Sequence, residues 1–173
     1  FEWLHATADF GKIIRIGIKG LKEKITESKK VYAGDREKQS FLDALNTVAD
    51  SMISWAHKCS DEAAAFAENV KNPEYKNNLK ILSETLKRVP EHPAESFYEA
   101  VLSIYLLFGY EPDSVGTLDR NLYDFYKKDI DDGKLTRDGA KEILQELFLM
   151  LQANTPKYSE NFTRGGESRF CVG

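Results

Sequence analysis

Cysteine is scarce in this sequence of 173 residues, which contains two, Cys59 and Cys171. Because they lie far apart and form no C-x-x-C motif, neither a disulfide framework nor a zinc site is indicated. No apolar run approaches the roughly 20 residues that span a bilayer. The first residues also lack the charged and apolar regions of a signal peptide. We therefore expect a cytoplasmic protein in a reducing compartment, with no membrane association.

Blocks of basic residues are also missing. The 24 lysines and arginines are offset by 28 aspartates and glutamates, which gives a net charge of -4. A mildly acidic, mixed surface does not favour nucleic acid or an anionic membrane as a partner. The chain begins with Phe1 rather than methionine, and it stops just after the strand-like residues Phe170, Cys171 and Val172. We therefore expect a fragment of a longer protein.

Helical periodicity dominates what is present. Apolar residues recur at helical spacing, and Asp9 and Thr136 stand where an N-cap is needed. Helices are expected from Asp9 to about Lys30, from Arg36 to about Val70, from about Tyr75 to Leu86, from Pro93 to about Gly109, from Leu118 to about Asp131, and after Thr136. The second helix would be about 50 Å long at 1.5 Å per residue. Since a globule of this length is only about 40 Å across, this helix must bend or belong to a larger body.

The remaining segments are short. Residues 111–117 are expected to form a loop, and Phe170 to Val172 are β-branched and aromatic enough for a short strand. The predicted fold class is therefore all-α, with about six helices, one of them very long, and a short β-strand at the C-terminal end. We expect a single helical domain over residues 1–173.

Two patterns resemble chemical sites but do not satisfy their requirements. Carboxylates at Asp129, Asp131 and Asp132 precede Gly133, as in a calcium loop. The remaining ligand positions of such a loop hold no suitable side chains, so a helix-capping turn is favoured. Cys59 and His57 diverge by about 200° on a helix, so they cannot share a metal ion. No metal site is predicted, and Cys59 is more typical of a small core residue than of a nucleophile.

Three stretches carry a resemblance to a known family. They read V-P-x-x-P-A-x-S-F-x-E-A, S-x-G-x-x-D-x-x-L-x-x-F-Y and D-x-x-x-G-x-L-T. The residues are Val89, Pro90, Pro93, Ala94, Ser96, Phe97, Glu99 and Ala100, then Ser114, Gly116, Asp119, Leu122, Phe125 and Tyr126, then Asp129, Gly133, Leu135 and Thr136. In this order they resemble the pyruvate formate-lyase-like domain of glycyl radical enzymes. Thr117 departs from the pattern, since the family usually has arginine there.

The resemblance implies a fold and a chemistry. The chain would be an interior piece of a larger α/β barrel, a homodimer when complete, in an enzyme of anaerobic metabolism. A radical-SAM activating enzyme would install a glycyl radical, and a thiyl radical formed from it would take a hydrogen atom from a small-molecule substrate. A neighbouring C–C, C–O or C–N bond could then break. This chain contains neither radical residue, so the resemblance implies that it is inactive by itself.

Two candidate site residues follow from the same resemblance. His5, with Asp9, Phe10 and Gly17, resembles a segment whose histidine faces the substrate in the dehydratases. Its near-neutral pKa suits proton transfer to a departing hydroxyl. Because an arginine stands there in pyruvate formate-lyase, His5 favours a lyase or dehydratase over a strict formate acetyltransferase. Ser114 matches a serine that binds substrate, although the residues alone equally allow a loop or N-cap serine.

An alternative remains at the level of sequence. The chain could be a stand-alone helical interaction module without catalytic activity, whose apolar stripes form its core or the surface for a partner helix. An open reading frame that continues beyond Gly173 would favour the enzyme, and a stop codon near that residue would favour the module.

Overall fold

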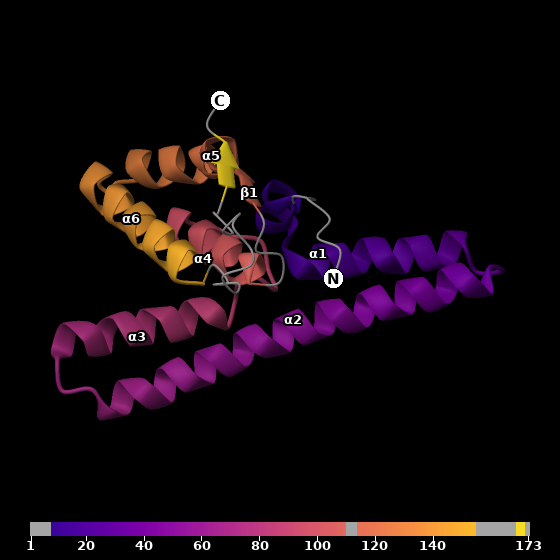
Figure 1. Ribbon diagram of the computed structural model, residues 1–173, viewed down its shortest axis with the longest axis horizontal. Helices are drawn as coiled ribbons and strands as arrows, with labels where there is room; N and C mark the ends of the chain where they lie inside the picture. The colour runs from indigo at the N-terminus through magenta and orange to yellow at the C-terminus, as the bar shows by residue number, and fades with distance from the viewer. Residues whose placement is uncertain (1–7, 110–113, 155–168, 172–173) are drawn as a thin grey trace, which may run out of the picture. The chain divides into compact units, whose positions relative to one another are not determined.

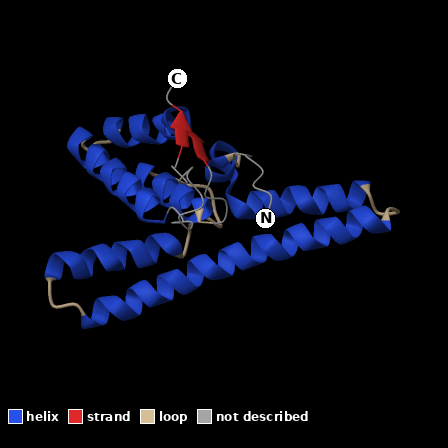
Figure 2. Cartoon of the chain, in the orientation of Figure 1, coloured by secondary structure: helices blue, strands red, loops and turns tan. Residues whose placement is uncertain are grey.

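The computed structural model describes residues 8–109, 114–154 and 169–171, which form six helices and two short strands (Figures 1 and 2). The elements are α1 (Phe10–Val31), α2 (Arg36–Asn69), α3 (Pro73–Leu86), α4 (Phe97–Phe108), β1 (Ser114–Thr117), α5 (Leu118–Asp131), α6 (Arg137–Asn154) and β2 (Arg169–Cys171). The predicted helical fold class is confirmed, and α2, with 34 residues, is the expected long helix. No helix in the described part of the chain combines the length and the apolar character needed to cross a membrane.

The chain divides into two compact units. One is continuous and comprises residues 15–93, and the other combines residues 1–14 with residues 94–173. The single-domain expectation stays a prediction. Each unit is described by itself below.

In the unit of residues 15–93, α2 packs with α1 beside its N-terminal part and with α3 beside its C-terminal part (Figure 1). Its buried face carries small residues, among them Ala56, Ala63 and Ala67. Small side chains let two helix backbones approach closely, and between α2 and α3 this approach is completed by a buried hydrogen bond. The hydroxyl of Ser60 donates to the carbonyl of Ser83 at 2.7 Å. Since both residues are almost fully buried, this bond satisfies groups that water cannot reach.

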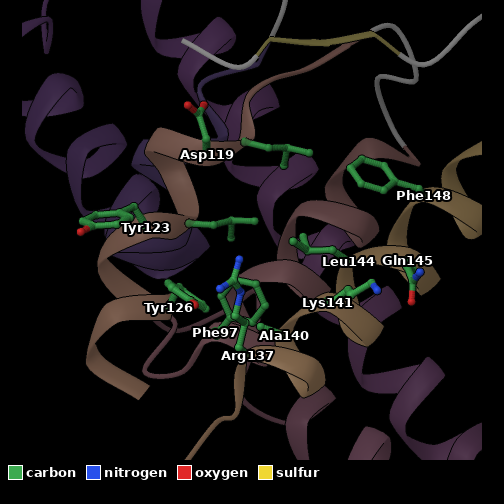
Figure 3. Close-up of a pocket in the computed structure, with 12 residues that line it drawn as sticks. Phe97, Asp119, Tyr123, Tyr126, Arg137, Ala140, Lys141, Leu144, Gln145 and Phe148 are labelled. Carbon is green, nitrogen blue, oxygen red and sulfur yellow. The ribbon is translucent and has the colours of Figure 1, made fainter. Parts of the chain in front are cut away.

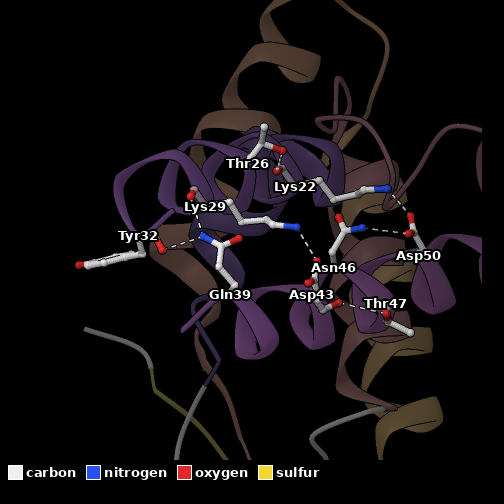
Figure 4. Close-up of polar contacts among 9 residues, drawn as sticks. All are labelled: Lys22, Thr26, Lys29, Tyr32, Gln39, Asp43, Asn46, Thr47 and Asp50. Atoms are coloured by element: carbon white, nitrogen blue, oxygen red, sulfur yellow. Dashed lines mark hydrogen bonds and ion pairs between the residues drawn. The ribbon is translucent and has the colours of Figure 1, made fainter. Parts of the chain in front are cut away.

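Polar groups join α1 to α2 along their length (Figure 4). Lys22 pairs with Asp50, and Lys29 pairs with Asp43. The side-chain amide of Gln39 donates to the carbonyls of Lys29, at 2.7 Å, and of Tyr32, at 2.9 Å. The amide therefore satisfies carbonyls that a helix end leaves without partners, whereas exposed ion pairs of this kind contribute little to stability.

Helix α1 is broken at Gly17, which the sequence analysis did not predict. Gly17 has φ of 67° and ψ of 170°, which is not helical. After the break, the amides of Ile18 and Lys19 donate to the carbonyls of Pro90 and Glu91, each at 2.9 Å. A side chain at Gly17 would collide with this segment, since a Cβ atom there would lie 2.6 Å from the carbonyl carbon of His92. The position therefore requires glycine both for its φ and for the close approach of backbone.

In the other unit, the predicted start of α4 at Pro93 is wrong. The helix begins at Phe97, with Ser96 as the N-cap residue, whose hydroxyl accepts from the amide of Glu99 at 3.2 Å. The carboxylate of Glu99 accepts in turn from the amide of Glu95 at 2.6 Å. This reciprocal arrangement resembles a capping box, and it outcompetes the weaker start signal of proline. The amide of Ala94, just before the helix, donates to the carbonyl of Ile14 at 2.9 Å.

The loop expected over residues 111–117 is also corrected. Its last four residues form β1, which pairs in parallel with β2. The strand expected near Phe170 is confirmed as β2. A four-residue strand whose partner is distant in the sequence gives almost no local signal, so the sequence could not reveal β1.

Replacing Gly17 by alanine should destabilise the unit of residues 15–93, because the backbone would be strained and the new methyl group would collide with the segment around His92. We expect Gly17→Ala to lower the free energy of unfolding by about 3 kcal/mol, measured by urea denaturation. Gly34→Ala is the matched control, since no atom lies within 4 Å of a Cβ placed there. Equal effects of the two substitutions would show that Gly17 is not constrained.

Candidate functional site

Ser114 lies at the start of β1 and is half-buried. Its hydroxyl accepts a hydrogen bond from the amide of Gly116 at 3.1 Å. The N-cap interpretation of Ser114 is wrong, because Thr117 is the N-cap residue of α5. Ser114 is also part of a strand rather than of a loop. Its backbone is therefore held by pairing to β2, where it lies opposite Arg169.

The junction between β1 and α5 is tightly built. Val115 is fully buried, and Gly116 has φ of 66° at an irregularity of the strand pairing. Thr117, which replaces the arginine of the resembling family, leads directly into α5 without a side-chain hydrogen bond at the cap. Core packing on one side and strand pairing on the other thus fix the direction of the Ser114 backbone.

The second predicted site residue, His5, lies outside the described residues. Both site assignments stay predictions.

Asp129 has a structural role that the sequence analysis missed. It is buried, with 4% of its surface exposed, and its carboxylate accepts from the amide of Phe97 at 2.7 Å. Its carbonyl accepts from the amides of Lys134, at 2.9 Å, and Leu135, at 3.1 Å. Asp129 therefore joins the start of α4, the end of α5 and the turn before α6. Within the described ranges, no group of three or more histidines, cysteines or carboxylates could hold a metal ion.

An apolar groove of about 520 Å³ lies between α5 and α6, above Phe97 of α4 (Figure 3). Its walls include Leu122 and Tyr126 of α5 and Leu144 of α6. Three charged side chains also line it, Asp119, Arg137 and Lys141, and Figure 3 shows Asp119 on the opposite side of the groove from Arg137. The groove can accommodate an apolar group, but it lacks adjacent acid and base groups for proton transfer.

The surroundings of Cys59 do not favour a reactive thiolate. Burial, followed by the negative charge of Glu62, raises the pKa of the Cys59 thiol above its ordinary value. The thiolate is the reactive form, so a raised pKa makes the thiol less reactive at neutral pH. His57 is engaged elsewhere, since its Nε2 lies 3.2 Å from a carboxylate oxygen of Glu91. The interpretation of Cys59 as a nucleophile therefore has no support in this geometry.

Comparison with known proteins gives matches over nearly the whole chain. The family model described as pyruvate formate lyase-like matches residues 4–170. The isethionate sulfite-lyase of Oleidesulfovibrio alaskensis is 34% identical over 160 residues, which cover 83% of this chain and 19% of that protein. The chain therefore spans about a fifth of the length of this relative.

Solved structures share the fold. A structure concerned with 1,2-propanediol dehydration in Roseburia inulinivorans matches with a TM-score of 0.80 and 28% identity, over 87% of this chain and 20% of that one. The glycerol-bound form of the B12-independent glycerol dehydratase from Clostridium butyricum matches with a TM-score of 0.84 over 98% of this chain and 23% of that one. At 22% identity, the second match concerns the fold alone.

Removing the carboxylate of Asp129 should leave the buried amide of Phe97 without its acceptor. We expect Asp129→Ala to lower the free energy of unfolding by about 2 kcal/mol, as for other hydrogen bonds to charged groups, and to accelerate hydrogen exchange at the Phe97 amide. Asp132→Ala is the control, because Asp132 is exposed and pairs only with Lys134 among the described side chains. If Asp132→Ala were as damaging as Asp129→Ala, the structural role assigned to Asp129 would be wrong.

The raised pKa of Cys59 predicts slow alkylation that depends on pH. Because less thiolate is present at a given pH, iodoacetamide should modify Cys59 more slowly than it modifies a free cysteine at pH 7.5. The rate for Cys59 should still be rising at a pH where that of free cysteine has levelled off. Peptide mapping by mass spectrometry separates Cys59 from Cys171. An alkylation rate already at its plateau at pH 8 would contradict the direction of the shift.

Proposed function

Since the chain belongs to the pyruvate formate lyase-like family, we propose that it forms part of the substrate-binding wall of a glycyl radical lyase or dehydratase. The observation that supports this most directly is the 34% identity to a lyase over 83% of the chain. The match to a structure concerned with diol dehydration, with a TM-score of 0.80, adds to it. The larger body in which we place this wall is an α/β barrel.

The radical chemistry would come from outside the described chain. When present, the glycyl radical supplies, through a cysteine thiyl, the abstraction of a hydrogen atom from substrate. We assign the radical glycine and the thiyl cysteine to the remainder of the polypeptide, and their activation to a radical-SAM enzyme.

The residues of this chain would bind the substrate and move a proton. We assign to His5 the donation of a proton to the oxygen of the departing hydroxyl, which leaves as water. We assign to the hydroxyl of Ser114 a hydrogen bond to a substrate oxygen, since a serine hydroxyl can both donate and accept. Its position on a paired strand supports this role, because a binding group must be held in place by rigid structure.

The proposal extends to the substrate class and the assembly. Histidine at position 5 lacks the planar fork with which arginine holds a carboxylate, so we favour a small hydroxylated substrate over the keto acid of a formate acetyltransferase. We further propose a cytoplasmic homodimer as the complete form, with this chain inactive by itself. The alternative, a stand-alone interaction module, is disfavoured by the match to the family over residues 4–170.

The test uses the full-length polypeptide with its activating enzyme and S-adenosylmethionine under anaerobic conditions. A glycyl radical doublet in the EPR spectrum is expected. His5→Gln should lower kcat by about 10²- to 10⁴-fold, as expected for loss of a general acid, while the radical yield stays the same. Ser114→Ala should lower kcat/KM by about tenfold, as expected for one lost hydrogen bond.

His92→Gln and Ser54→Ala are the matched controls, since both change the same residue types at positions outside the proposed site. They should leave kcat and KM unchanged. The proposed function would be refuted by a full-length protein that forms no glycyl radical, and the proposed roles by His5→Gln and Ser114→Ala variants that turn over like the controls.

A further inference from the structure

Helix α2 has two apolar faces of opposite character. The face that is buried in this unit carries mainly alanine, whereas a second face carries large apolar side chains that are exposed. Phe41 is 63% exposed, Val48 51% and Phe66 55%. Burying a large apolar side chain stabilises a protein by about 1.5–3 kcal/mol, far more than burying alanine. A helix that buries its alanines and exposes its large apolar residues therefore indicates a second partner.

The exposed residues follow a regular spacing. Together with the half-buried Met52, they occur after steps of four, three, four and three residues, and then eleven residues on, at Phe41, Leu45, Val48, Met52, Trp55 and Phe66. A repeat of 3.5 residues keeps one apolar seam on a single side of a helix, which is the pattern that packs against another helix along its length. This apolar seam, residues 41–66, is about 38 Å long at 1.5 Å per residue. Its length excludes a short peptide as the natural partner.

The charges around the apolar seam further restrict the kind of helix that could pack against it. The flanking residues between its first and fifth members include Ala44, Thr47, Ser51 and Ser54, which are small, uncharged and exposed. Such a flank permits close approach of another backbone without unpaired charges. One heptad position of the seam is charged, Glu62, which is exposed. The partner should therefore be an apolar helix with a single basic residue near Glu62.

We propose that the apolar seam of α2 is covered by a long α-helix from the remainder of the same polypeptide, apolar at 3.5-residue spacing and basic opposite Glu62. This inference rests on the proposed function, since it requires a longer parent chain. The chain spans only 19% of the length of the isethionate sulfite-lyase that it resembles. Most of the apolar surface available to cover the seam therefore belongs to the rest of the polypeptide rather than to a second copy.

Thiol accessibility in the full-length protein tests whether the seam is covered. Val48→Cys places a thiol on the seam, and Val31→Cys, at a residue 75% exposed at the end of α1, is the matched control. In the folded full-length protein, maleimide should modify Cys at position 48 at least about tenfold more slowly than Cys at position 31, because reaction requires local opening. Equal rates in the folded protein would overturn the inference. Both thiols should react equally fast in urea.

Cross-linking then identifies the segment that covers the apolar seam. A photo-reactive phenylalanine analogue at position 41 should form a cross-link within one polypeptide, to a helix outside residues 1–173 that has the stated apolar repeat. A cross-link to a second copy, detected by mixing isotope-labelled and unlabelled protein, would overturn the inference, as would a cross-link within residues 1–173 or none at all. The EPR measurement separates the two proposals: a protein that carries the glycyl radical but has an uncovered seam refutes this inference alone.

Discussion

The backbone break at Gly17 is the constraint on which the arrangement of this chain depends. An uninterrupted α1 would use the amides of Ile18 and Lys19 for its own hydrogen bonds. Because the helix is broken there, these amides bind the carbonyls of Pro90 and Glu91, and the carbonyl of Ile14 accepts from a residue just before α4. One left-handed glycine thus redirects backbone groups that then hold a segment more than 70 residues later in the sequence.

A second theme is that this chain uses small residues where it packs closely and polar side chains where helices end. Alanines and the Ser60–Ser83 hydrogen bond bring α2 against α3. The carboxylate of Asp129, which belongs to another helix, accepts from the first amide of α4 and so supplements the local N-cap. These are contacts of a rigid scaffold, and they suit a chain whose proposed contribution is to hold one substrate-binding wall in place.

Much of the fold could be predicted because its signals are local. Asp9 and Thr136 cap α1 and α6 as expected, since each accepts from an amide three residues later. The strand β1 and the break at Gly17 depend on distant partners, so no local pattern could specify them. The start of α4 does carry a local capping signal, Ser96 followed by Glu99, which outweighs the start signal of Pro93. The candidate site was harder to predict from the sequence than the fold. Ser114 could be identified as a candidate only through a family resemblance, and its pairing with another strand is visible only in the structure.

The two compact units differ in how their sequences are arranged. Residues 15–93 are contiguous, whereas the other unit needs both residues 1–14 and residues 94–173. On the ribosome, the first unit is complete as soon as its last helix emerges, and its contacts are close in sequence, which favours rapid folding. Residues 8–14, in contrast, can make their contacts with the split unit only after the residues from Ala94 onward have been synthesised. The order of translation therefore favours completion of the continuous unit before the split one.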